Sequence, residues 1–324
     1  MKATLLAVDL GGSKIAGALV TSGGEVRHVR TVPTPRSGLE PLMDQLMALI
    51  EELLAHAEGA VRGIGLAVPG IVEADTGTAV VAANLPWQRT PLAGIVSRRT
   101  GVQTIVGNDA DGATLAERWF GAATACRTYI CMTIGTGIGG GVVIDGKLLR
   151  GAHGSGAEIG HMIVDTSGPR CRCGSPGCLE VLAAGPAIAA RMRALGGTAV
   201  NAKSVIDAAR SGDPLAERVL SDTAAYLAIA VVNLWRLFEP ELLVLGGGVA
   251  AAGDLILQPL LGHIERLTPT RAFPYEAVRC STIHQESSFL AAASLVLEAE
   301  AEAAATRPTT IAASAAPVSS RRLT

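Results

Sequence analysis

The sequence has few aromatic residues, no extended run of basic residues and no hydrophobic segment of membrane length. Aromatic residues make up only 3% of the 324 residues, which disfavours a surface that binds nucleic acid by stacking bases on rings. The formal net charge of −2 provides no general attraction to nucleic acid or to anionic membranes. The longest apolar stretch, Thr223 to Trp235, is about half of the ~20 residues that a membrane-spanning helix needs.

The amino terminus also lacks the pattern of a secretion signal. Its apolar run is short and is interrupted by Asp9, so we predict a first strand there. Free thiols, and a zinc loop predicted by the cysteine spacing, fit a reducing compartment, and we expect a cytoplasmic protein. With 49% hydrophobic residues, a chain of this length can form the cores of two ordinary domains.

Three of the six cysteines gather in one segment together with a histidine. His161, Cys171, Cys173 and Cys178 fall within eighteen residues of a stretch rich in glycine and proline. One imidazole and three thiolates form a complete tetrahedral ligand set for Zn²⁺, which leaves no position open for water. Buried thiols without a metal are the alternative, because free cysteine is commonly buried. The clustering favours a structural zinc site.

The hydrophobic pattern predicts two α/β units that begin alike. In the first, strands at 4–9, 14–20 and 26–32 precede a helix near 39–54, where apolar residues recur at intervals of three and four. A similar order restarts at Tyr129, with a glycine-rich segment (135–141) between two strands.

Glycine-rich turns follow three of the predicted strands. Glycine lets a backbone approach an anion and point its N–H groups toward it, so three such turns favour a nucleotide between the two units. Each turn alone could be purely steric. Asp9, at the first turn, is suited to Mg²⁺, which prefers oxygen ligands. The candidate nucleotide-binding residues are Asp9, Gly11, Gly12, Ser13, Lys14, Gly135, Thr136, Gly137, Gly246 and Gly247.

The pair Asn108-Asp109 lies between a predicted strand and a predicted helix. A helix cap explains such a pair without any chemistry. The functional interpretation is that Asp109 is a general base, which takes the proton of a hydroxyl that attacks phosphorus.

Together these segments resemble the ROK family of repressors, open reading frames and sugar kinases, within the actin/hexokinase/Hsp70 superfamily. The resemblance extends from the first strand to about residue 298, and its most specific segments are EIGH and CRCGSPGCLE. The matching segments are DLGGSK (9–14), AVPG (67–70), NLPW (84–87), GNDA (107–110), TIGTGIGGG (133–141), EIGH (158–161), CRCGSPGCLE (171–180) and LGGGV (245–249).

The resemblance implies a two-lobed, actin-like (ribonuclease H-like) α/β fold with duplicated domains, an interdomain cleft and a zinc-binding loop at 161–180. We expect an N-terminal domain over 1–118, joined by a returning helix at about 287–300, and a C-terminal domain over 119–286. Residues 303–324 contain no aromatic and no acidic residue and are rich in Ala, Ser, Thr and Pro; we predict disorder there.

The resemblance also assigns roles to individual residues. Asp109 would be the catalytic base, and His161 would bind zinc through one ring nitrogen and face the sugar with the other. Such coupling would let the metal organise the sugar pocket. The implied sugar-binding residues are Gly70, Asn84, Asn108, Asp109, Glu158, His161 and Glu180.

These assignments predict an ATP- and Mg²⁺-dependent kinase for the 6-hydroxyl of an aldohexose, with glucose favoured by the NLPW segment. N-acetylglucosamine or N-acetylmannosamine kinase is the alternative within the same chemistry. A sugar-responsive repressor is disfavoured because the first strand begins at Thr4, leaving no room before it for a helix-turn-helix. A homo-oligomer, dimer or tetramer, is expected from the family. Asp111 departs from the family pattern, in which asparagine is frequent.

Overall fold

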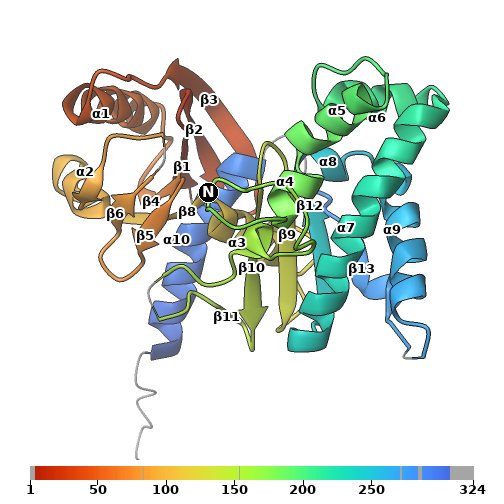
Figure 1. Ribbon diagram of the computed structural model, residues 1–324. Helices are drawn as coiled ribbons and strands as arrows, with labels where there is room; N and C mark the ends of the chain where they lie inside the picture. Colours follow the sequence, from red (N-terminus) through yellow and green to blue (C-terminus); the bar gives the residue numbers. More distant parts are fainter. Residues whose placement is uncertain (1–3, 83, 153, 271, 284–286, 307–324) are drawn as a thin grey trace, which may run out of the picture.

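Two sheets with the same strand order form the framework of the protein. The computed structural model describes residues 4–82, 84–152, 154–270, 272–283 and 287–306. Within them, one five-stranded sheet has the order β3-β2-β1-β4-β8 and another has the order β11-β10-β9-β12-β13 (Figure 1). In each sheet the first three strands are antiparallel and the last three are parallel. The predicted two-lobed, duplicated α/β fold is confirmed.

The strands of the first sheet are β1 (Thr4–Leu10), β2 (Lys14–Thr21), β3 (Val26–Pro33), β4 (Val61–Val68) and β8 (Thr104–Asn108). A small antiparallel sheet beside it contains β5 (Ile71–Glu73), β6 (Thr78–Val81) and β7 (Gln88–Thr90). The strands of the second sheet are β9 (Tyr129–Ile134), β10 (Ile138–Ile144), β11 (Lys147–Leu148), β12 (Leu242–Gly246) and β13 (Val278–Cys280).

The helices are α1 (Leu39–Ala55), α2 (Leu92–Thr100), α3 (Asp109–Phe120), α4 (Leu179–Ala183), α5 (Gly185–Ala194), α6 (Ala202–Arg210), α7 (Pro214–Phe238), α8 (Gly247–Ala250), α9 (Asp254–Leu267) and α10 (Ser287–Thr306), with 3₁₀ turns η1 (Ile159–His161) and η2 (Tyr275–Ala277). We call residues 4–120 together with α10 the N-terminal half, and residues 129–280 the C-terminal half.

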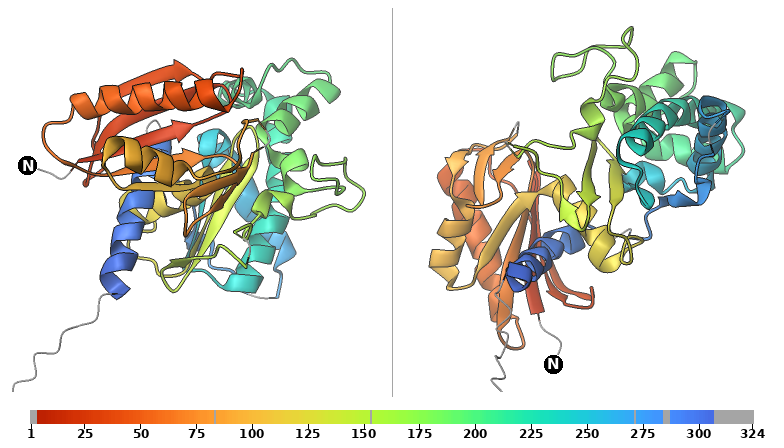
Figure 2. Two further views of the ribbon diagram at one scale, coloured as in Figure 1. Left: turned by 90° about the vertical axis from the view of Figure 1, so that its left-hand side faces the viewer. Right: turned by 90° about the horizontal axis from the view of Figure 1, so that it is seen from below.

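Strand alternation decides which helices cover each face of the first sheet. Leu6 and Val8 of β1 belong to a buried cluster with α1 and α2. Their neighbours Leu5 and Ala7 point to the opposite face, where α3 and α10 pack. The same cluster includes Tyr129 and other residues of the second sheet, so α3 and α10 lie between the two sheets (Figures 1 and 2).

The C-terminal helix returns to the N-terminal half, as the family resemblance implied. Helix α10 packs so closely on β4 that a side chain at Gly65 would collide with the carbonyl of Ala292. The helix continues to Thr306, so the first four residues of the predicted disordered tail, 303–306, are helical; the alanine and glutamate residues before Thr306 favour helix. Residues 307–324 lie outside the described residues.

One predicted turn is partly strand. The sequence suggested a turn over 135–141, whereas β10 already begins at Ile138. The glycines of this strand face neighbouring elements: a Cβ at Gly140 would collide with the Cys131 carbonyl, and one at Gly141 would lie 2.5 Å from the Thr114 hydroxyl of α3. These glycines therefore allow close packing of β10, and only residues 135–137 remain as a turn.

Among the helices of the described residues, none combines the length and the apolar character required to cross a bilayer.

Candidate active site

A cavity of about 440 Å³ lies between the two halves. Its wall contains acids from the N-terminal half and glycine turns from the C-terminal half. The residues predicted from sequence that line it are Asp9, Asp109, Gly135, Thr136, Gly137, Glu180, Gly246 and Gly247. The sheets themselves produce this convergence, because the carboxyl ends of neighbouring parallel strands meet at one edge.

Asp9 and Asp109 come from the same edge of the first sheet. Asp9 is near the end of β1, opposite Ala67 of β4, and Asp109 begins α3 immediately after β8. Burial raises the pKa of both carboxyl groups; a hydrogen bond from Ser288 and the charge of Lys14 oppose the rise at Asp9. At Asp109, the charge of Asp9 raises the pKa further. Of two such carboxyl groups, one can bind a divalent cation and the other can accept a proton.

Asn108 uses both ends of its side-chain amide within the protein. Its oxygen accepts hydrogen bonds from the backbone N–H groups of Ala110 (2.8 Å) and Asp111 (3.3 Å), which caps α3. Its nitrogen donates to the Gly70 carbonyl at 2.9 Å. The capping interpretation is therefore confirmed, and the residue also fixes the turn after β4. Gly70 has φ +90°, in the region that favours glycine.

The first glycine turn contacts a segment far away in sequence. A Cβ at Gly12 would lie 3.0 Å from the Cβ of Asn84, so two predicted ligand-binding segments are adjacent. Within the turn, the Gly11 N–H donates to the Lys14 carbonyl at 2.9 Å. The side chains of Ser13 and Lys14 are exposed.

The glycine turn at 135–137 is anchored on both sides. The Gly135 N–H donates to the Gly137 carbonyl at 2.9 Å, and the Gly185 N–H donates to the Gly135 carbonyl at 2.8 Å. Gly247 lies beside this turn with φ +81°, and a Cβ there would be 2.5 Å from the Ile134 carbonyl oxygen. The two turns therefore lie against each other, and their close approach requires glycine at position 247.

The four predicted zinc ligands converge. Ligand atoms of His161, Cys171, Cys173 and Cys178 all lie within 4.8 Å of one another. The Cys171 sulfur is 3.6 Å from Nδ1 of His161, and the sulfurs of Cys173 and Cys178 are 3.5 Å apart. With metal–ligand bonds of about 2.0–2.3 Å, tetrahedral Zn²⁺ requires ligand separations of about this size. The donor set fits zinc, which would be held through Nδ1 of His161 and leave Nε2 for another partner.

Glu158 and Glu180 bracket this loop and differ in setting. Oε2 of Glu180 accepts a hydrogen bond from the Ile138 N–H at 3.0 Å, which joins the end of the zinc loop to the glycine turn. Glu158 is exposed, and its charge raises the pKa of Asp109 and of Asp111. Ala157, immediately before it, has φ +59°, an uncommon conformation for a residue with a side chain.

A second cavity, of about 400 Å³, adjoins the same glycine turns and was not predicted from the sequence. Gly135 and Thr136 line both cavities, and the second continues between α5, α6 and α8 past Arg193, Asn201 and Lys203. The one signal in the sequence was a helix-start pattern: Asn201 and Ser204 form a reciprocal capping box at the start of α6.

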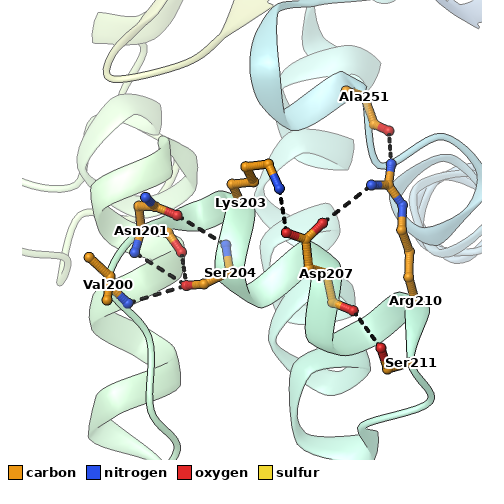
Figure 3. A network of polar contacts seen from close by, with 8 residues as sticks. All are labelled: Val200, Asn201, Lys203, Ser204, Asp207, Arg210, Ser211 and Ala251. Atoms are coloured by element: carbon orange, nitrogen blue, oxygen red, sulfur yellow. Dashed lines mark hydrogen bonds and ion pairs between the residues drawn. The ribbon is translucent and has the colours of Figure 1, made fainter.

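Polar contacts hold this wall of the second cavity in place (Figure 3). Lys203 donates to Asp207 at 2.5 Å, and Arg210 donates to the same carboxylate at 3.4 Å and to the Ala251 carbonyl at 2.6 Å. Helix α6 is thereby tied to the segment that follows α8.

Residues 5–299 match the model of the ROK family. This chain belongs to the ROK family. It is 35% identical over 314 residues to a glucokinase of Thermotoga maritima, covering 92% of this chain and 98% of that protein. It is 36% identical over 275 residues to an N-acetylmannosamine kinase of Shigella flexneri, covering 82% and 92%.

Solved ROK structures have the same fold. A ROK glucokinase from Streptomyces griseus in complex with glucose and AMPPNP aligns with a TM-score of 0.76 at 32% identity, covering 90% of this chain and 98% of that one. A ROK transcriptional regulator, a homologue of the E. coli MLC protein, aligns with a TM-score of 0.82 at 27% identity, covering 92% and 78%. The actin-like fold is thus shared by ROK kinases and regulators.

Proposed function

We propose that this ROK sugar kinase transfers the γ-phosphoryl group of ATP to the 6-hydroxyl of glucose, with Asp109 as the general base. The main observation in support is the position of Asp109, on the wall of the cavity beside Asp9 and opposite the glycine turns. The pKa of its carboxyl group is raised there. A raised pKa suits a base that must accept a proton during the reaction.

The two adjoining cavities suggest how the substrates divide the site. The phosphates would lie along the glycine turns, where backbone N–H groups can face them. The base of the nucleotide would enter the cavity beside α5 and α6, and the sugar would lie near Asp109, Asn84 and Glu158. Magnesium bound near Asp9 would neutralise phosphate charge. Closure of the halves would exclude water that could otherwise accept the phosphoryl group.

The zinc loop would organise the sugar side of the site. With Nδ1 of His161 directed to the cysteines, Nε2 is the ring atom that remains for a sugar hydroxyl. The metal would fix the ring orientation, and Glu180 would couple the loop to the glycine turn through its contact with Ile138. Zinc would therefore be structural and would act on the sugar mainly through His161.

The choice of glucose rests on similarity to glucokinases and on the NLPW segment. Identity does not separate the alternatives, since the N-acetylmannosamine kinase is as similar as the glucokinase. N-acetylmannosamine and N-acetylglucosamine are therefore the second candidate substrates. The cytoplasmic location and the dimer or tetramer remain predictions.

The test is ATP-dependent ADP release with glucose, mannose, fructose, N-acetylglucosamine and N-acetylmannosamine, each at several concentrations. We expect the highest kcat/KM for glucose. A higher value for an N-acetylated sugar would transfer the assignment to that substrate. ADP release with none of the sugars, from folded protein containing zinc, would refute the kinase proposal for ATP.

A further inference from the structure

Two segments carry the chain between the halves. Residues 121–128 connect α3 to β9, and the segment that begins at Ser281 leads from β13 towards α10. Any rotation of one half relative to the other must be absorbed by these two crossovers, because they are the covalent links between the sheets. A group that contacts both would determine whether they bend independently or together.

The side chain of Glu117 contacts both crossovers. It is on the last turns of α3 and only 3% exposed. One carboxylate oxygen accepts a hydrogen bond from the N–H of Ala122, in the first crossover, at 3.0 Å. The other accepts one from the hydroxyl of Ser281, at the start of the second crossover. A single buried carboxylate thus joins the segment that follows α3 to Ser281, which lies 164 residues after Glu117 in the sequence.

Each end of this contact is itself fixed. The Ser281 N–H donates to the Leu245 carbonyl of β12 at 2.7 Å, and its hydroxyl oxygen accepts from the Ile283 N–H at 3.0 Å. The Glu117 carbonyl accepts from the N–H groups of Gly121 and Ala123. Movement at either crossover would therefore be transmitted to the Glu117 carboxylate.

The surroundings of Glu117 leave it little freedom. A Cβ at Gly121 would collide with the carboxylate, so glycine at that position makes room for it. Glu117 and Ser281 also belong to the wall of the cavity of about 440 Å³ between the halves. Both carboxylate oxygens of Glu117 already accept protein hydrogen bonds, which argues against a direct role in the chemistry.

We propose that Glu117 is a positioning residue that links the two crossovers, so that they move together as one hinge. It thereby sets the closed arrangement of the halves around ATP and sugar. The inference rests on the proposed function for the identity of the ligands. Burial of a carboxylate costs free energy unless hydrogen bonds compensate it. Here the compensation comes from the two segments on which closure depends.

The variants that test this are Glu117→Ala, Glu117→Gln and Ser281→Ala, with Glu298→Gln as the matched control. Glu298 is equally buried (3%) but bonds to Arg118 and Trp119 rather than to a crossover. Glutamine at 117 can still accept from Ala122 through its oxygen and donate to Ser281 through its nitrogen. It should therefore rescue what alanine loses.

Three measurements are compared: amide hydrogen exchange at the two crossovers, compaction on adding glucose and AMPPNP by small-angle X-ray scattering, and kcat with KM for both substrates. For Glu117→Ala and Ser281→Ala we expect exchange at Ala122 to rise about tenfold. We also expect reduced compaction, and a lower kcat together with a higher KM for both substrates, about tenfold in kcat/KM. Glu117→Gln and Glu298→Gln should stay within about threefold of the parent protein.

The proposal fails if Ser281→Ala and a folded Glu117→Ala retain the compaction, exchange and kinetics of the parent protein. It also fails if Glu298→Gln changes these three quantities as much as Glu117→Ala does. If the parent protein phosphorylates no sugar, the proposed function fails. Hydrogen exchange at the two crossovers still tests whether Glu117 links them. If Glu117→Ala does not fold, Ser281→Ala decides, because it removes only a hydroxyl.

Discussion

The two halves have the same sheet order but contribute different chemistry. The N-terminal half places two acids, Asp9 and Asp109, at the carboxyl edge of its sheet. The C-terminal half contributes glycine backbone and, between β11 and α4, the loop that carries the four predicted zinc ligands. A duplicated framework therefore does not impose duplicated function. The difference arises in the segments that follow the strands, where side chains can change without disturbing the sheet.

The largest expected effect concerns the acids of the N-terminal half. Asp109→Ala should reduce kcat by about 10²- to 10⁴-fold, because the attacking hydroxyl loses its proton acceptor. ADP release in the presence of the preferred sugar measures this. Asp44→Ala, at an exposed position of α1, is the control and should keep the parent rate. A rate for Asp109→Ala within a few-fold of the parent would exclude Asp109 as the base.

The zinc loop provides the corresponding test in the C-terminal half. Cys173→Ser should lose the metal and raise the KM for sugar by about tenfold or more, while the KM for ATP changes less, because the effect passes through His161. Elemental analysis and steady-state kinetics measure the two effects. Arg172→Ala, which changes an exposed side chain of the same loop that is not a predicted ligand, should keep both. Metal-free protein with normal sugar affinity would show that the loop and the pocket are independent.

Glycines at equivalent positions of the two sheets should differ in how much their substitution by alanine destabilises the protein. Gly140→Ala in β10 would force a methyl group against the Cys131 backbone carbonyl, whereas the nearest atom to a Cβ at Gly17 in β2 is the flexible end of Leu53, at 2.6 Å. We expect Gly140→Ala to lower the free energy of unfolding by about 2–3 kcal/mol and Gly17→Ala by about 1 kcal/mol or less. Chemical denaturation of both variants checks the order; equal losses would contradict it.

At Asp111, in contrast, a substitution should stabilise the protein. Burial, together with the charges of Asp109 and Glu158, raises the pKa of this carboxyl group to about 6, against the opposing charge of Arg150. A raised pKa in the folded state means that stability decreases as pH rises from about 4 to 6. Asp111→Asn should remove this decrease and stabilise the protein at pH 7–8 by on the order of 2 kcal/mol. Thermal unfolding across pH 4–8 measures it. An unchanged pH dependence would assign the titration to other groups.

The sequence predicted the parts of the site that depend on local pattern. The four predicted zinc ligands lie within eighteen residues, so their convergence follows from short-range spacing. Asp109 directly follows a strand, which places it at the edge of the sheet. Contacts between distant segments could not be predicted in this way. Nothing in the local sequence indicates that Glu117 meets Ser281, or that Gly12 lies against Asn84.

The glycine segment at 135–141 illustrates a different limit. Glycine is needed both in turns and where two backbones approach closely, and the sequence alone does not distinguish the two causes. At Gly135–Gly137 it forms a turn, whereas at Gly140 and Gly141 it admits the neighbouring strand and α3. Only the packing of β9 and α3 against β10 separates the two causes.

The return of α10 to the first sheet has a consequence for biosynthesis. Leu5 and Ala7, near the start of the chain, are buried against residues of α10 such as Ala292 and Val296. A ribosome makes residues 4–120 long before it makes α10, which covers part of one face of their sheet. Until then, that face is exposed and prone to wrong contacts. The half that is made first is therefore the last to be completed, and the C-terminal half can be complete before it.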